Sequence, residues 1–413
     1  MTTTQPTPTP PTPTPPTYPM ARECPFDPPA EVRALREESP VSRVRIWDGS
    51  SPWLVTRYDD VRAVLADQRF SSDVDKPGYP ATSIGVKARR KESRSFIAMD
   101  DPDHARHRKM LIGEFTVRRT ESLRPLVEET VTELLDAMET LPQPVDLVEA
   151  FALPLPSMVI CRMLGVPYAD HAFFQEHSRA LLDVTTGADA AKHANDELRG
   201  YLAELVAAKE REPGDDLLSR LVERRIHTGE LTADDAVGMA FLLLVAGHET
   251  TANMTGLGTL TLLRHPDQAA EVRGGDPATV AAAVEELLRL LTVVHTGRRR
   301  AATEDVEIGG VLIRAGEGVI AAGESANRDP EQFANPDELD IHRRGNHHVA
   351  FGFGVHQCLG QPLARLELQI AYPALLRRFP GLRAAVPVDE IPFRDEMVVY
   401  GVHTLPVRWD TAV

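Results

Sequence analysis

A glycine-rich stretch at 351–360 contains the residue with the clearest chemical potential, Cys358, in the run Phe-Gly-Phe-Gly-Val-His-Gln-Cys-Leu-Gly. Apolar residues follow at helical spacing, which predicts a helix that begins at the cysteine, with Pro362 in its first turn. The N-terminus of a helix favours a thiolate, and glycines let a backbone pass close to a flat or bulky group. Because a thiolate is a metal ligand as well as a nucleophile, the stretch indicates a metal cofactor. A buried structural cysteine is the alternative.

A second polar group interrupts a long apolar segment. The run Phe-Leu-Leu-Leu-Val at 241–245 is followed by Ala-Gly-His-Glu-Thr-Thr, which contains Gly247, Glu249 and Thr250. Glycine inside a helix costs about 1 kcal/mol relative to alanine, so a functional or close-packing reason is expected for it. A threonine hydroxyl there can bond the carbonyl four residues earlier and loosen the helix. A helix face that simply reaches solvent is the alternative.

The elements that must position these residues are mainly helical. The spacing predicts a helix over 232–264, about 50 Å long, with a capping box at its start. Helical patterns dominate 103–263, whereas short strands and turns occupy 44–56 and the region from 306 onward. Asp59 or Asp60 is a candidate N-cap for a helix over 58–67, and a polar loop covers 71–96. We predict a mainly α fold with a small β region.

Composition and charge restrict the classes of protein. The 413 residues are 42% hydrophobic and carry a formal net charge of −16, which disfavours nucleic acid as a partner. No run of about 18 apolar residues exists, so no membrane span is expected. The three cysteines are far apart and odd in number, which argues against disulfides, and the start does not read as a signal peptide. We predict a cytoplasmic protein with a disordered Thr/Pro-rich tail at 1–22 and one domain at 23–413.

The pattern Phe-x-x-Gly-x-His-x-Cys-x-Gly, together with Ala-Gly-His-Glu-Thr-Thr, resembles the cytochrome P450 monooxygenases over about residues 23–410. The resemblance implies a single-domain cytochrome P450 fold, haem b as cofactor and Cys358 as its proximal ligand. Glu249 would relay protons and Thr250 would hydrogen-bond the dioxygen. The same resemblance implies haem contacts by His104, Arg108, Ala246, Gly247, Arg300, Phe351, His356 and Gly360. It implies a substrate pocket lined by Leu243, Ala246, Val293, Val294, Val398 and Val399.

Other matches to the family are structural or depart from its pattern. Glu286 and Arg289 match a Glu-x-x-Arg pair that supports the fold, with Arg343 or Arg344 as third partner. The run 298–300 consists of three arginines, whereas the family mostly has uncharged residues at the first two of these positions. By its position in the pattern, Arg300 is expected to reach the haem. Pro373 falls inside the predicted helix after Cys358 and should kink or end it. Spacing of the histidines at 342, 347 and 348 fits no zinc pattern, so a surface loop is expected.

The implied reaction inserts one oxygen atom of O₂ into a lipophilic small molecule, such as a macrolide, terpenoid, sterol or xenobiotic. NAD(P)H would supply electrons through a separate ferredoxin and reductase, because the chain has no Gly-rich nucleotide fingerprint. Exposed Arg106 and Lys109, with Arg365, could form a basic docking patch for an acidic ferredoxin; an ordinary solvated face is the alternative. The chain is expected to be a monomer. A peroxide-using or rearranging haem-thiolate enzyme and a haem-based ligand sensor remain rivals, and neither has much use for Glu249 and Thr250.

Overall fold

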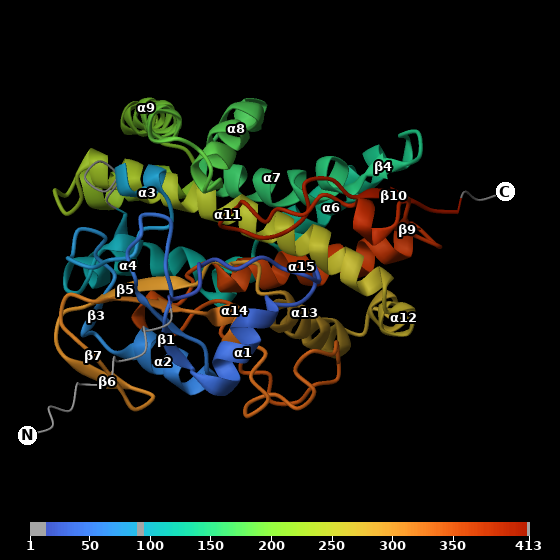
Figure 1. Cartoon of the computed structure of the whole chain (residues 1–413). Coiled ribbons are helices and arrows are strands. Elements are labelled where there is room, and N and C mark those ends of the chain that lie inside the picture. The colour runs from blue at the N-terminus through green and yellow to red at the C-terminus, as the bar shows by residue number, and fades with distance from the viewer. Residues whose placement is uncertain (1–13, 89–94, 411–413) are drawn as a thin grey trace, which may run out of the picture.

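The long helix α11, Ala233–Leu263, forms the axis of the helical part of the molecule. It starts with the predicted capping box, in which Thr232 and Asp235 bond each other's backbone N–H groups, and it ends just before Pro266. Helices α7, α9, α13 and α15 pack around it, which is why its apolar residues continue round most of its circumference. In the computed structural model, which describes residues 14–88 and 95–410, α11 crosses the whole helical layer (Figure 1).

The helices occupy most of the described chain. Their bounds are α1 Ala30–Glu38, α2 Tyr58–Ala66, α3 Ile84–Ala88, α4 Asp103–Leu111, α5 Val117–Glu121, α6 Arg124–Glu139, α7 Pro154–Leu164, α8 His171–Leu182, α9 Ala188–Arg211, α10 Leu217–Leu221, α12 Pro266–Gly274, α13 Pro277–Leu291, α14 Gly323–Ala326 and α15 Gln361–Arg378. Short 3-10 turns η1 Phe96–Ala98 and η6 Gly354–His356 lie beside the site described below. Within the described ranges, no helix has both the length and the apolarity needed to cross a membrane.

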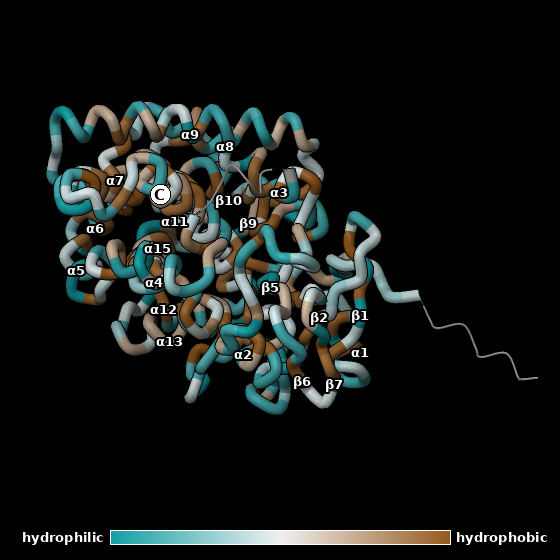
Figure 2. The backbone as a smooth tube through the Cα atoms, turned by 90° about the vertical axis from the view of Figure 1, so that its left-hand side faces the viewer, coloured by the Kyte–Doolittle hydropathy of each residue, from teal (hydrophilic) through white to brown (hydrophobic). Residues whose placement is uncertain are grey.

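The β region is small and lies to one side. The strands are β1 Val41–Arg43, β2 Trp53–Val55, β3 Phe70–Ser71, β4 Val145–Asp146, β5 Arg298–Ala302, β6 Val306–Ile308, β7 Val311–Ile313, β8 Gly318–Ala321, β9 Arg383–Ala384 and β10 Pro406–Arg408. The largest sheet has the order β1-β2-β8-β5-β3, with β2 and β8 parallel and its other pairs antiparallel. Figure 2 shows β1, β2, β6 and β7 together with α1 and α2, opposite α7. The prediction of a mainly helical fold with a small β region is confirmed.

One local expectation is wrong, and a second is wrong in one of its two alternatives. Arg57, not Asp59 or Asp60, is the N-cap of α2, and the carboxylate of Asp329 accepts the backbone N–H of Tyr58 at 2.9 Å. A residue distant in sequence therefore accepts a backbone N–H from the first turn of that helix, which has no acceptor within the helix. Helix α15 does not end at Pro373 but continues to Arg378. Pro373 is buried among elements that pack on α15, so tertiary packing outweighs the missing N–H at this position.

The predicted tail boundary is also wrong within the described residues. Residues 16–18 pair with Arg45, whose N–H donates to Pro16 O and whose carbonyl accepts from Tyr18 N, both at 2.8 Å. Tyr18 is only 3% exposed and donates from its hydroxyl to Glu324. Tyr18 therefore anchors this segment, because burial of its ring and the two backbone hydrogen bonds offset the conformational entropy lost when the segment is ordered. The rest of the tail prediction, residues 1–13, lies outside the described residues.

Candidate active site

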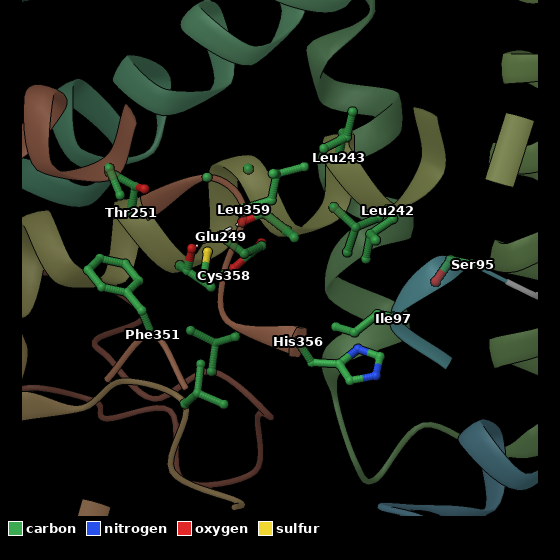
Figure 3. Close-up of a pocket in the computed structure, with 18 of the residues that line it drawn as sticks. Ser95, Ile97, Leu242, Leu243, Glu249, Thr251, Phe351, His356, Cys358 and Leu359 are labelled. Carbon is green, nitrogen blue, oxygen red and sulfur yellow. Dashed lines mark hydrogen bonds between the residues drawn. The ribbon is translucent and has the colours of Figure 1, made fainter. Parts of the chain in front are cut away.

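A cavity of about 590 Å³ lies between α11 and the loop that carries Cys358. Its walls are mostly apolar, and Figure 3 shows Leu242 and Leu243 of α11 facing the same space as Phe351, Cys358 and His356. Sequence-predicted residues that line it are Arg108, Leu243, Ala246, Gly247, Glu249, Thr250, Val293, Val294, Arg300, Phe351, His356, Cys358, Gly360, Val398 and Val399. The fold therefore brings together residues from five separate stretches of the chain. His104 does not line the cavity but lies behind His356, with the ring centroids 4.0 Å apart.

Cys358 lies three residues before α15, not in it, and its side chain is exposed to the cavity. Its backbone N–H donates to Phe351 O at 2.8 Å, which closes the loop. Burial raises the pKa of the Cys358 thiol, while a hydrogen bond from Gly360 N–H and the nearby Arg298 charge oppose that shift. The helix terminus alone thus does not make this thiol acidic. A coordinated metal cation would make the thiol acidic, because it deprotonates a coordinating thiol outright.

The glycines of the loop have a reason other than the one expected. Gly352 and Gly354 have positive φ angles of 77° and 73°, a region that side chains rarely adopt. A Cβ on Gly354 would lie 2.4 Å from Leu65 O at the end of α2, and one on Gly352 would lie 3.0 Å from Arg298 Nε. The loop is therefore pressed against the protein itself at these two positions.

Three nitrogen-bearing side chains, those of His104, Arg108 and Arg300, gather around His356 at one side of the cavity. Burial, reinforced by the charges of Arg300 and His104, lowers the pKa of His356 to about 3. His104 Nδ1 contacts Asp101 at 2.9 Å, and its buried Nε2 has no partner within residues 14–88 and 95–410. A cluster with surplus donors and an orphaned buried nitrogen fits the two carboxylates of a haem.

The strand β5 determines which way each arginine of the run 298–300 points. Alternation along β5 directs Arg298 and Arg300 to the cavity and Arg299 to the opposite face, where it donates to Gly297 O at 3.3 Å and Thr296 Oγ1 at 3.4 Å. The register is set by pairing with β8, in which Arg299 lies opposite Ile320. The expectation for Arg300 agrees with this placement, whereas Arg298 is a cavity residue that sequence reasoning left out.

Glu249 and Thr250 lie on α11 at the cavity, but the helix there is continuous. Thr250 Oγ1 donates to Ala246 O at 3.0 Å, the expected bond to the carbonyl four residues earlier. Glu249 is 3% exposed, and its Oε2 contacts Arg394 Nη1 at 3.1 Å. Asn253 hydrogen-bonds to both residues of this ion pair: its Nδ2 donates to Glu249 O at 2.7 Å, and its Oδ1 accepts from Arg394 Nη1 at 3.2 Å. Arg394 lies far away in sequence, so no local signal could have identified it.

Gly247 is explained by close packing. An ideal Cβ on this residue would lie 2.8 Å from Cγ1 and 3.0 Å from Cδ1 of Ile160 on α7. Gly247 thus lets α7 and α11 approach each other directly behind the cavity wall formed by Ala246 and Thr250.

The substrate side of the cavity combines two distant segments. Val294 bridges Val399 in antiparallel fashion, and Tyr400 N donates to Val293 O at 2.7 Å, so 293–294 and 398–399 form one apolar wall. Phe96 and Ile97 of η1 also line the cavity, together with Val74 and Val86 from the predicted polar loop, and none of these four was among the expected pocket residues. Residues 89–94 of that loop lie outside the described part of the chain. The only sequence signal for this part of the wall was the apolar pair Phe96 and Ile97 at the end of the polar loop.

The Glu286–Arg289 pair is fully buried, with Arg289 Nη2 and Nε each 2.8 Å from a carboxylate oxygen of Glu286. Arg343, not Arg344, is the third partner, at 3.0 Å. Arg289 also donates to the carbonyls of Asn327 and Pro336. The network ties α13 to the segment that leads into the Cys358 loop, as predicted, and does not line the cavity.

The histidine-rich segment is only partly a surface loop. His342 is exposed, whereas the side chain of His348 is 2% exposed and contacts Glu285 at 3.1 Å. Arg365 Nε contacts the same carboxylate at 2.6 Å, and burial is outweighed by these partners, so the pKa of Glu285 falls to about 2. Among the described residues, no three His, Cys, Asp or Glu side chains gather as metal ligands.

A cysteine thiol open to an apolar cavity, with two histidines and two arginines clustered beside it, fits the class of haem-thiolate proteins. The comparisons then define the family. The family model described as Cytochrome P450 matches residues 8–274 and 279–404, and the chain belongs to that family. It is a cytochrome P450 monooxygenase of the bacterial, actinobacterial type, with haem as cofactor.

Individual relatives cover nearly the whole chain. Cytochrome P450-SU2 of Streptomyces griseolus is 55% identical over 395 residues, which are 95% of this chain and 97% of that protein. Pentalenic acid synthase of Streptomyces avermitilis is 52% identical over 392 residues, with 95% and 97% covered. The solved structure of mycinamicin VIII C21 methyl hydroxylase MycCI from Micromonospora griseorubida, bound to mycinamicin VIII, superposes with a TM-score of 0.91. It is 42% identical, with 95% of this chain and 100% of that chain covered.

Proposed function

We propose that Cys358 binds the iron of haem b and that the enzyme hydroxylates or epoxidises a lipophilic small molecule in the cavity. The observation that carries this proposal is the Cys358 thiol, open to the cavity next to the cluster of His104, Arg108, Arg300 and His356. These four residues would hold the haem carboxylates. When bound, the haem supplies the chemistry of O₂ activation, while the chain supplies position, axial ligand and proton path.

Glu249 and Thr250 are proposed to move protons at the α11 side of the cavity. Thr250 Oγ1 gives its hydrogen to Ala246 O, so its lone pairs remain available as acceptors toward the cavity. Arg394 and Asn253 hold the Glu249 carboxylate in place. Apolar residues Leu243, Val293, Val294, Val398 and Val399 would bind the substrate and keep bulk water out.

The first experiment tests the ligand. Cys358→His should bind haem through an imidazole and lose the red-shifted carbon monoxide band of a thiolate-ligated ferrous haem. A band that survives this substitution would mean that another residue ligates the iron. Oxygen consumption after anaerobic reduction, with and without added ferredoxin, then tests turnover against a peroxide-only enzyme or a sensor.

The substrate class is proposed from the apolar wall and from relatives. A pentalenic acid synthase and a mycinamicin VIII hydroxylase at high identity support a secondary metabolite such as a terpenoid or macrolide, or else a sterol or xenobiotic. Haem spectral shifts across a library of such compounds would rank them, and a library of polar acids and sugars is the control. Preferential shifts with the polar set would contradict a lipophilic substrate.

A ferredoxin, reduced by an NAD(P)H-dependent reductase, is the proposed electron donor. Arg106 and Lys109 are exposed on α4, on the side opposite the buried His104. Arg365 does not strengthen this basic patch, because Glu285 pairs with its guanidinium at 2.6 Å and 2.9 Å. The proposed patch therefore consists of the two α4 residues.

A further inference from the structure

Arg298 is a partly buried cation at the wall of the cavity, and the proposed haem contacts do not include it. It is the first residue of β5, and it lines the cavity together with Arg300, two residues further along the same face. Its Nη2 donates to Ala350 O at 2.5 Å, which fixes the guanidinium beside the segment leading to Cys358.

The surrounding backbone is shaped around this guanidinium. A Cβ on Gly352 would lie 3.0 Å from Arg298 Nε, and a Cβ on Gly323 would lie 3.0 Å from Arg298 Nη1. Contacts this close are tighter than side chains normally tolerate, so two glycines from separate segments leave room for one arginine. The position of the guanidinium is therefore built into the fold.

One nitrogen of this arginine lies outside the hydrogen-bond network. Nη1 is buried and makes no hydrogen bond with any residue that the structure describes. Burial lowers the pKa of Arg298 to about 10, so the side chain still carries its charge at neutral pH. The acidic groups that face it are Cys358 and Glu324, and Arg300 is the cation that faces it. A cation at the wall of an apolar cavity favours a counter-charge there, and the anions that a haem brings are its carboxylates.

We propose that Arg298 is a haem-positioning residue whose guanidinium pairs with a haem carboxylate and, as a fixed cation near Cys358, raises the reduction potential of the haem. The inference rests on the proposed binding of haem at Cys358. Reduction of the iron from ferric to ferrous adds one electron, supplied by ferredoxin in the proposed reaction and by dithionite in the test. A buried positive charge stabilises the reduced state, because the surrounding dielectric constant is low.

The test is a spectroscopic redox titration of the haem-loaded protein with dithionite, comparing wild type with Arg298→Gln, Arg298→Lys and Arg299→Gln. Arg299 is the matched control, since it is adjacent on β5 but faces away from the cavity. Arg298→Gln should lower the ratio of reduced to oxidised protein at a fixed potential about tenfold, which is ~59 mV for a one-electron couple. Arg298→Lys should stay near wild type, and so should Arg299→Gln.

Transfer of haem to excess apomyoglobin is the second measurement, and it should be severalfold faster for Arg298→Gln than for Arg299→Gln. Failure of Arg298→Gln alone to retain haem is the extreme form of the same result. An unchanged potential in Arg298→Gln, or an equal fall in Arg299→Gln, overturns the proposal. The carbon monoxide band of wild type and Cys358→His tests the haem ligand separately, so the two proposals can fail independently.

Discussion

The tight packing of Gly247 against Ile160, next to the cavity, makes Gly247→Ala an informative perturbation. A new Cβ would lie 2.8 Å from Ile160 Cγ1, an atom near the stem of that side chain and not at its flexible end. Ile160 is 2% exposed, so it has little freedom to move away. Either α7 and α11 separate, or α11 shifts toward the cavity and displaces Ala246 and Thr250.

The expected magnitude is the difference of two terms. Overpacking of a filled core costs about 1–3 kcal/mol, whereas alanine in place of glycine inside a helix contributes about 1 kcal/mol. Gly247→Ala should therefore destabilise the protein by up to about 2 kcal/mol. In an Ile160→Ala background the obstacle is gone, and the same substitution should stabilise by about 1 kcal/mol. The sign of its effect thus depends on Ile160.

Urea unfolding of wild type, the two single variants and the double variant measures this coupling. Gly256→Ala is the matched control on the same helix, because its Cβ would meet only Val402 at 3.5 Å and Val148 at 3.9 Å, ordinary contacts. It should be neutral or stabilising in both backgrounds. An equal effect of Gly247→Ala with and without the Ile160 side chain would refute the packing explanation of this glycine.

Three further predictions address stability, catalysis and electron transfer. Arg289→Met leaves Glu286 with only part of its network and should cost about 3–5 kcal/mol in urea unfolding, and a loss below ~1 kcal/mol would contradict the network's role. Thr250→Ala should retain haem and substrate binding but release more peroxide per NAD(P)H consumed; unchanged coupling would point to another proton path. Arg106→Glu with Lys109→Glu should weaken ferredoxin-driven turnover and flatten its salt dependence, while peroxide-driven turnover stays unchanged. Equal loss in both assays would mean damage to the haem site instead of to docking.

Local spacing was sufficient where neighbours in sequence are neighbours in space. The capping box of α11, the Glu286–Arg289 pair and the bond from Thr250 to Ala246 each join residues three or four apart on one helix. Such pairs follow from helix geometry alone, so the sequence predicts them. The partner of Glu249 is different, because Arg394 reaches α11 only after the C-terminal segment has folded back over it.

The arginine run shows why the remainder needed the structure. A strand directs alternate side chains to opposite faces, so three consecutive arginines must divide two to one between the cavity and the other side. Which two face the cavity depends on the pairing of β5 with β8, and a slip of one residue would place Arg299 there instead of Arg298 and Arg300. The run itself contains no information about that register. The glycines that accommodate Arg298, at 323 and 352, come from segments outside the strand, so only the assembled fold identifies this arginine as part of the cavity wall.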